Sequence, residues 1–262
     1  MHKKMPVLFL GHGSPMNAIE ENEFVKGFRD IAQEIRQPKA IICISAHWET
    51  RGTYLTAMKK PKTIHDFGGF PAELYNVQYN APGNATLALK IKENACNNDI
   101  KLDNEQWGLD HGAWSVLKHL YPKAEIPVVQ MSLDYTKKMS DHISIAKEID
   151  WLRKNDVLVI GSGNIVHNLR ILDWKNINKE NHAFDWTRNI QEKVNTLITN
   201  NDINALVRYE NIDSDIKLAV PTPEHYLPML YCMALRDEND DIKLFNDKAV
   251  GGSITMTSFK IG

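Results

Sequence analysis

The sequence predicts an α/β fold: a single domain, residues 1–262, with a central mixed, mostly parallel β-sheet flanked by helices and an active site at the C-terminal ends of the strands. Short apolar runs of strand length alternate with longer stretches of helical periodicity. No internal repeat and no Gly-, Ser- or Pro-rich linker divides the chain. Several apolar runs end in small residues followed by a histidine, and ligands of open α/β sheets collect at that edge.

The N-terminal half supplies two strands and two helices. Residues 7–10 form an apolar run of strand length that stops at a glycine. Residues 20–36 are predicted to form an amphipathic helix, because phenylalanines and isoleucines recur on one face. The apolar run 39–45 predicts the next strand, and residues 85–98 have the pattern of a second helix.

The C-terminal half continues the alternation. Apolar runs predict four further strands, and helical periodicity predicts two further helices. A Gly-Gly pair predicts the turn between the last two strands. The predicted strands are residues 127–133, 157–160, 242–245 and 254–259, and the predicted helices are residues 140–155 and 185–200.

Composition and charge exclude several functional classes. Hydrophobic residues make up 43% and charged residues 24% of the chain, as in ordinary globular proteins. A net charge of −2 gives no basic footprint for nucleic acid or an anionic membrane, and no apolar run is long enough to cross one. The first apolar segment is too short for a signal peptide. Three scattered cysteines without a CxxC pair indicate reduced thiols, so we expect a cytoplasmic protein.

Two histidines lie just beyond the first two predicted strands. His12 has glycines on both sides, which let the chain turn tightly and leave the imidazole uncovered. His47 follows an apolar run that stops at Ser45, so we expect it near the rim of the sheet. The alternative for each is a structural histidine that bonds to a backbone carbonyl.

Two later histidines could join them. His167 follows a strand that ends in Gly-Ser-Gly-Asn, which is neither a GxGxxG nor a Walker loop, and this position suits an active-site histidine. His225 follows a proline-rich approach and could open a helix. Either His225 or Glu224 could complete a metal site begun by His12 and His47. The alternative is a solvated pair in the first turn of that helix.

Other motifs suggest a substrate pocket. His65 and Phe67 lie in a loop with a Gly-Gly hinge, whose composition suits closure over an apolar, planar substrate, although an ordinary surface loop fits equally. Trp48 could wall such a pocket or simply pack. His111 follows Asp110, and an adjacent acid is useful to an acid–base residue. The remaining histidines have no such surroundings and are predicted to be structural or exposed: His2, His119, His142 and His182.

Taken together and in order, these motifs resemble those of the class III extradiol ring-cleaving dioxygenases, in particular their DOPA-dioxygenase-type branch. Any one motif is weak, but six in one order over nearly the whole chain are specific. The six are Gly11-His12-Gly13-Ser14-Pro15, Ser45-Ala46-His47-Trp48, His65-Asp66-Phe67-Gly68-Gly69-Phe70-Pro71, Leu109-Asp110-His111-Gly112, Gly161-Ser162-Gly163-Asn164 with His167-Asn168-Leu169, and Pro223-Glu224-His225.

The resemblance implies a non-haem metal site that binds a catechol and cleaves its ring with O₂ beside the two hydroxyls. By motif, His12, His47 and His225 match the metal ligands of this branch. His167 matches the acid–base histidine, which in zinc-loaded relatives also reaches the metal, and His111 matches a second pocket histidine. We expect a monomer or small homo-oligomer with a small catechol and O₂ as partners, and neither nucleic acid nor a membrane.

The third ligand position departs from the wider superfamily, whose better-known members use two histidines and a carboxylate. Three neutral imidazoles leave the site one negative charge poorer, which suits Zn²⁺. Zinc cannot change oxidation state, so we expect Zn²⁺ as the bound metal and Fe²⁺ as the working metal. The alternatives are a zinc-dependent hydrolase and a non-catalytic binding protein of the same fold.

Overall fold

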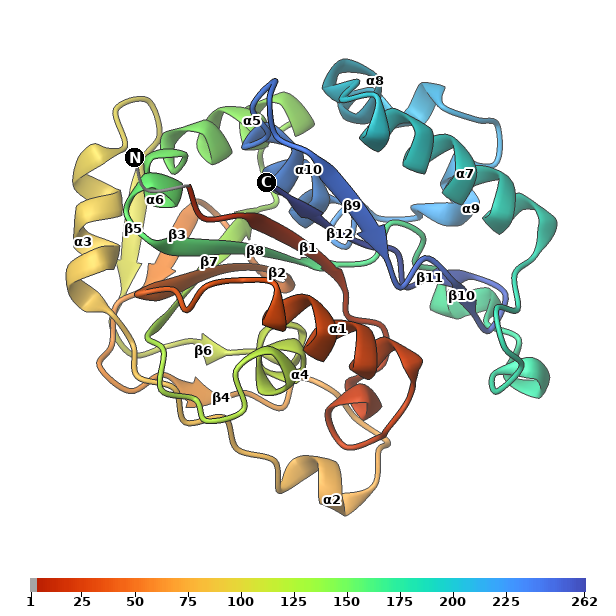
Figure 1. The fold of residues 1–262 in the computed structure, drawn as a ribbon, viewed down its shortest axis with the longest axis horizontal. Helices are drawn as coiled ribbons and strands as arrows, with labels where there is room; N and C mark the ends of the chain where they lie inside the picture. Colours follow the sequence, from red (N-terminus) through yellow and green to blue (C-terminus); the bar gives the residue numbers. More distant parts are fainter. Residues whose placement is uncertain (1–3) are drawn as a thin grey trace.

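A mixed eight-stranded sheet forms the centre of the computed structural model, which describes residues 4–262 (Figure 1). Its strand order is β5-β3-β7-β2-β8-β1-β12-β9. The central strands β7, β2, β8 and β1 run parallel, and β5 is parallel to β3. The other neighbours, β3 with β7, β12 with β1 and β9 with β12, are antiparallel. The strands are β1 (Val7–Gly11), β2 (Ala40–Thr50), β3 (Thr53–Thr56), β5 (Ile100–Asp103), β7 (Val128–Asp134), β8 (Val157–Gly163), β9 (Ile242–Phe245) and β12 (Ser258–Ile261).

Helices cover both faces of this sheet because its central strands are apolar on both sides. In β1, Phe9 packs into the core cluster that contains the buried side chains of α5 and α10, whereas Leu8 packs into the cluster with those of α1 and α4. In Figure 1, α1 and α4 accordingly lie below the sheet, and α5 and α10 above it. The longer helices are α1 (Glu23–Gln33), α3 (Ala85–Asn94), α4 (His111–Leu120), α5 (Met139–Glu148), α7 (Asp185–Thr199) and α10 (Leu227–Ala234).

Short elements connect these larger ones. The short strands pair in two small sheets, β4 with β6 and β10 with β11. The short elements are η1 (Pro15–Ala18), β4 (Lys62–Thr63), α2 (Ala72–Tyr75), β6 (Gly108–Leu109), α6 (Trp151–Lys154), η2 (Leu169–Ile171), η3 (Trp174–Asn176), α8 (Ile203–Val207), η4 (Tyr209–Asn211), α9 (Ile216–Ala219), β10 (Ala249–Val250) and β11 (Ile254–Thr255).

The predicted α/β class with a mixed, mostly parallel sheet is confirmed, and several boundaries differ. Helix α1 begins at Glu23 because the Asn22 side chain caps it by accepting a hydrogen bond from the Val25 backbone. The predicted helix 140–155 is divided into α5 and α6, and the predicted strand 254–259 into β11 and β12. Strand β2 continues beyond Ser45, so His47 lies within a strand rather than after one.

The parallel centre of the sheet determines where the site forms. Strands β2, β8 and β1 are neighbours, so their carboxyl ends lie side by side. Between Ile44 and Glu49 the pairing of β2 with β7 shifts register, and this irregular stretch contains His47.

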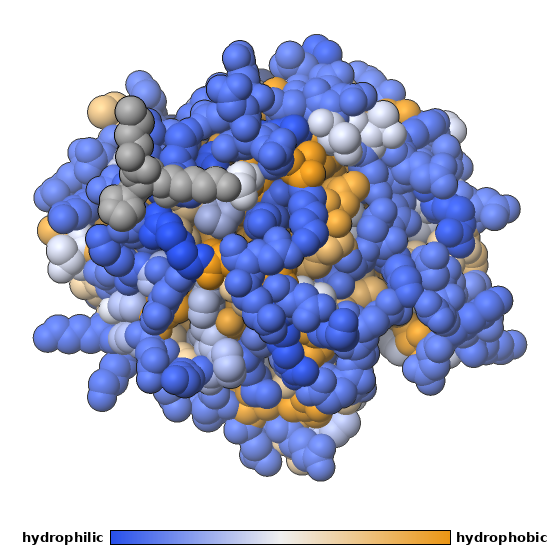
Figure 2. All heavy atoms as spheres, viewed as in Figure 1, coloured by the Kyte–Doolittle hydropathy of each residue, from blue (hydrophilic) through white to orange (hydrophobic). Residues whose placement is uncertain are grey.

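Within residues 4–262, none of the helices has the length and apolar character needed to span a bilayer. On the face in Figure 2, hydrophilic residues cover most of the surface.

Candidate metal centre

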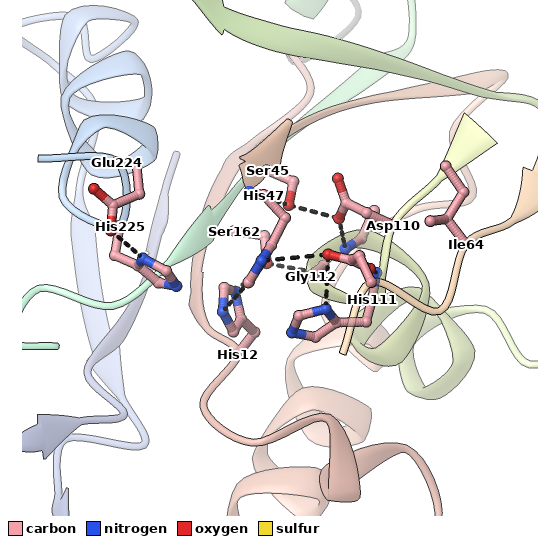
Figure 3. Close-up of polar contacts among 12 residues, drawn as sticks. His12, Ser45, His47, Ile64, Asp110, His111, Gly112, Ser162, Glu224 and His225 are labelled. Carbon is pink, nitrogen blue, oxygen red and sulfur yellow. Dashed lines mark hydrogen bonds and ion pairs between the residues drawn. The ribbon is translucent and has the colours of Figure 1, made fainter. Parts of the chain in front are cut away.

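Five buried or half-buried histidines converge at the carboxyl edge of the central strands: His12, His47, His111, His167 and His225. The ring centroids of His12, His47 and His225 lie 5.0 to 5.3 Å apart pairwise. The other two rings flank this trio. His111 is 3.9 Å from His47, and His167 stacks on His225 at 3.6 Å. Figure 3 shows the rings of His12, His47, His111 and His225 facing a common centre.

These histidines come from five separate segments. His12 follows β1, His47 lies in β2, and His111 is the first residue of α4. His167 lies in the loop after β8, where its backbone N–H donates to the Ala219 carbonyl. His225 lies two residues before α10.

Glycine at position 163 allows the His225 segment to approach β8. A Cβ atom at Gly163 would lie 2.2 Å from the carbonyl oxygen of His225. The next residue, Asn164, donates its backbone N–H to that same carbonyl at 3.0 Å. The chain around residue 225 therefore packs directly on the end of the strand, which a larger side chain would prevent.

Hydrogen bonds fix the tautomer of His12. The Ser162 hydroxyl donates its one proton to the Gly112 carbonyl at 2.5 Å. Its oxygen lies 3.0 Å from His12 Nδ1 and must therefore accept from an Nδ1–H group. The Nε2 atom of His12 then carries the lone pair. A metal-binding histidine usually donates its other ring N–H to a hydrogen-bond acceptor, as Nδ1 of His12 does here to Ser162.

Carboxylates play the same part behind the other two rings of the trio. His47 Nδ1 lies 3.4 Å from Asp66 Oδ2, and His225 Nδ1 lies 3.1 Å from Glu224 Oε1. Both Nδ1 atoms can thus donate outward, which leaves the Nε2 lone pairs inward. His225 Nε2 is buried and has no hydrogen-bond partner among the described residues.

The spacing of the Nε2 atoms of His12 and His47 fits a divalent cation. His47 Nε2 and His12 Nε2 lie 3.2 Å apart. Two nitrogens at about 2.0–2.1 Å from a tetrahedral zinc ion would be about 3.3 Å apart. Burial, followed by the neighbouring His111, lowers the pKa of His47 to about 3, and burial also lowers the pKa of His12 and His225. All three are therefore neutral near pH 7, with lone pairs available to a metal.

Two separate groups of ligand atoms are each compact enough to hold one ion. In each group the candidate ligand atoms lie within 4.8 Å of one another, and the sequence-predicted ligands are divided between them. The groups are His12 with His47 and His111, and His167 with Glu224 and His225.

His111 lies against a second acid besides the adjacent Asp110. Its backbone N–H donates to Asp66 Oδ1 at 2.9 Å, and its Nδ1 lies 3.0 Å from Asp66 Oδ2. Asp110 instead caps α4 by accepting from the Ala113 backbone, and it accepts from the Ser45 hydroxyl at 2.7 Å. Asp110 therefore acts on the His111 ring through its charge, whereas its carboxylate accepts hydrogen bonds in the helix cap and from Ser45.

His167 is held beside the trio, stacked on His225. Its ring is nearly parallel to that of His225, with an interplanar angle of 10°. Burial lowers the pKa of His167 to about 4, against the opposing charge of Glu224. The side chain is therefore neutral near pH 7 and able to accept a proton.

Comparison with known proteins identifies the family of this chain. Residues 6–256 match the family model described as the catalytic LigB subunit of aromatic ring-opening dioxygenase. The chain belongs to this family. It is similar to a 4,5-DOPA dioxygenase extradiol of Escherichia coli K12, with 40% identity over 99% of this chain and 95% of the relative. A protein of the same name from Beta vulgaris is 34% identical over 96% of this chain and 94% of its own.

A solved structure has a similar fold. The crystal structure of an uncharacterized protein from Escherichia coli K12 has 36% identity and a TM-score of 0.85, with 99% of this chain and 100% of that chain covered. The protein is thus a LigB-type extradiol aromatic ring-opening dioxygenase, as the sequence motifs predicted.

The predicted substrate-binding residues lie at different places relative to the five histidines. The ring of Phe67 meets the edge of His111, with centroids 5.5 Å apart. His65 lies on Phe67 rather than on His111, and it donates from Nε2 to the Val77 carbonyl. Trp48 is buried and stacks on Trp107, 5.6 Å away. Among the described residues no ring contact joins it to the five histidines, which favours packing as its role.

The other histidines of the LigB-type chain make polar contacts elsewhere. His119 Nε2 lies 2.7 Å from the Asn17 carbonyl, and His182 Nε2 lies 2.9 Å from Asp173. His142 Nδ1 lies 2.9 Å from the Tyr231 hydroxyl. These contacts agree with structural roles, although the rings are buried or half-buried rather than exposed. His2 lies outside the described residues.

Sequence reasoning did not assign roles to two residues of the site. Asp66 contacts both His47 and His111, and Ser162 fixes the tautomer of His12. Asp66 was visible as part of a His-Asp pair in a Gly-Gly loop. No signal in the sequence identified Ser162, because its role depends on the neighbouring position of β1 in the sheet.

Proposed function

We propose that the protein cleaves the ring of a catechol beside its two hydroxyls and consumes O₂ to form a semialdehyde. Two relatives that are named 4,5-DOPA dioxygenase extradiol match nearly the whole chain. The observation that carries the proposal is the pair of Nε2 atoms of His12 and His47, 3.2 Å apart, beside the unpartnered Nε2 atom of buried His225.

His12, His47 and His225 would hold one divalent metal ion per chain. Each has an acceptor oxygen 3.0 to 3.4 Å from Nδ1, which favours a lone pair at Nε2, and burial keeps each ring neutral. Fe²⁺, when bound, would supply Lewis acidity to the two catechol oxygens and a route for electrons from the ring to O₂. We propose Zn²⁺ as the metal found in purified protein and Fe²⁺ as the working metal, because zinc does not change oxidation state.

His167 would act as the base toward the substrate. Its ring is neutral near pH 7 and lies against His225, so it can accept the proton of a catechol hydroxyl at Nδ1 or Nε2. Glu224, whose charge favours the protonated form of His167, would stabilise the imidazolium that results.

On the opposite side of the pocket, His111 would accept a proton from the catechol at Nε2 as the substrate binds, and would return that proton later in the reaction. Asp66 lies behind its Nδ1 and would stabilise a protonated ring, as the aspartate does behind the histidine of a catalytic triad. Phe67, edge-on to His111, would present an apolar surface to a planar aromatic ring and help to exclude water. We propose a DOPA-like catechol as the substrate class.

Oxygen uptake with defined metals tests this function. Protein reconstituted anaerobically with Fe²⁺ is mixed with a panel of small catechols, and O₂ consumption and semialdehyde absorbance are recorded. We expect turnover of at least one catechol with Fe²⁺ and none with Zn²⁺. Ester or amide hydrolysis by the zinc form without O₂ uptake would favour a hydrolase. Catechol binding without turnover in either form would favour a binding protein.

A further inference from the structure

We propose that Asp66 is a positioning residue, whose single carboxylate fixes the orientation and tautomer of both His47 and His111 and attaches the Phe67 loop to the site. The inference deepens the proposed function and rests on it, because it takes His47 as a metal ligand and His111 as the residue that accepts and then returns a proton at Nε2. Asp66 would touch neither metal nor substrate.

Three polar contacts meet at this carboxylate. Oδ1 accepts the backbone N–H of His111 at 2.9 Å, and Oδ2 lies 3.0 Å from His111 Nδ1 and 3.4 Å from His47 Nδ1. The two imidazoles come from α4 and β2, and their centroids are 3.9 Å apart. One side chain therefore links two elements at the point where their rings meet.

The backbone on either side of Asp66 is firmly held. The Ile64 carbonyl accepts from Trp114 Nε1 at 2.7 Å, and the Ile64 N–H donates to Leu109 at 2.7 Å. Phe67 packs edge-on against His111. The open part of the loop begins after these contacts, because a Cβ atom at Gly68 would meet nothing within 4 Å. Asp66 thus belongs to the fixed half of the loop.

The chemistry of the carboxylate decides the tautomer. An ionised aspartate only accepts hydrogen bonds, so it favours Nδ1–H on both His47 and His111 and leaves both Nε2 lone pairs toward the site. An asparagine of the same shape could keep the bond to the His111 backbone through Oδ1, but its amide N–H groups would then face the two Nδ1 atoms. That arrangement favours Nε2–H and removes the lone pair that a metal needs at His47.

Zinc titration and imidazole NMR test this role in the full-length protein. We expect Asp66→Asn to bind Zn²⁺ about 10- to 100-fold more weakly in chelator competition, as outer-shell substitutions do. Nitrogen-15 spectra of the zinc-loaded protein should show Nδ1–H at His111 in the wild type and Nε2–H in the variant. Glu73→Gln, an exposed acid in nearby α2, is the matched control and should leave both unchanged. Asp66→Glu should recover part of the zinc affinity.

Zinc affinity of Asp66→Asn within twofold of the wild type, with His111 still protonated at Nδ1, would overturn the inference. An Nε2–H tautomer at His111 in the wild type would do so even if the variant failed to fold. Neither readout needs a catechol. A wild type with the expected zinc affinity and tautomers but no O₂ uptake would therefore overturn the proposed ring cleavage and leave the role of Asp66 standing.

Discussion

The imidazole of His225 lies flat against that of His167, with centroids 3.6 Å apart and planes inclined by 10°. The two rings differ in their polar surroundings. His225 has Glu224 behind its Nδ1 and an unpartnered Nε2, as expected of a ligand. His167 is anchored by its backbone to Ala219 and lies on the outer side of the stack. Mutation of each residue should therefore separate metal binding from proton transfer.

Replacement of His167 by alanine should lower kcat by about 10²–10⁴, the usual cost of removing a positioned acid–base group. Metal content should remain close to one ion per chain, because the trio of Nε2 atoms is intact. The measurement is kcat with Fe²⁺ beside metal analysis of the same sample. Full loss of the metal would instead assign His167 as a ligand.

Replacement of His12 or His47 by alanine should deplete the metal. Each supplies one of the two Nε2 atoms that lie 3.2 Å apart, and two remaining imidazoles hold a divalent ion poorly. Metal per chain is measured after dialysis against a weak chelator. His182→Ala serves as the control, since that ring contacts Asp173 away from the site. Near-normal metal in both site variants would refute their assignment.

Replacement of Gly112 by alanine should weaken zinc binding by about tenfold or more. The added Cβ would lie 2.5 Å from Ser45 Oγ and 2.8 Å from His47 Cδ2, so the His47 ring must shift. Gly68→Ala is the matched control, because its Cβ would meet nothing within 4 Å. Chelator competition with both variants checks the expectation. Equal affinities would show that the His47 ring tolerates displacement.

The apoprotein should lose stability in acid through His142, which lies away from the five site histidines. Burial, opposed by Asp134, lowers its pKa to about 4 in the folded state, against about 6.5 when unfolded. Below pH 6.5 the unfolded chain binds a proton that the folded chain does not, so the free energy of unfolding falls until about pH 4. The loss is about 3 kcal/mol.

Urea unfolding in the presence of EDTA measures this effect. His142→Gln does not titrate but can still hydrogen-bond the Tyr231 hydroxyl, which lies 2.9 Å from the histidine ring. Between pH 6.5 and 4, the slope of its unfolding free energy against pH should be smaller than that of the wild type. The difference in slope should correspond to at most about one bound proton. Parallel pH curves for variant and wild type would contradict the assignment.

The sheet and the convergence of histidines could be predicted because both depend on local patterns. Apolar runs indicated the buried strands, and small residues with a histidine marked the strand ends. Strands β3 and β5 and helix α4 were not predicted. No secondary structure was predicted around His111 and Gly112. The helix there is established by the Asp110 cap and by packing of Trp114 in the core.

The partners behind the imidazoles could not be derived from the sequence. Asp110 is next to His111 in the chain, yet the carboxylate that lies against His111 Nδ1 is that of Asp66, from a separate loop. Glu224 was recognised beside His225 because the contact is local. The single catalytic domain, the cytoplasmic location and a monomer or small homo-oligomer stay predictions.

Strand order also has a consequence for biosynthesis. Strand β1 is synthesised before both of its neighbours, because it lies between β8 and β12, which follow it by about 150 and 250 residues. A nascent polypeptide that stops before His225 has neither β12 nor the third proposed nitrogen. Metal acquisition should therefore wait until the segment that carries His225 has been synthesised and has packed on β8, so loading with zinc would report that this edge of the sheet has formed.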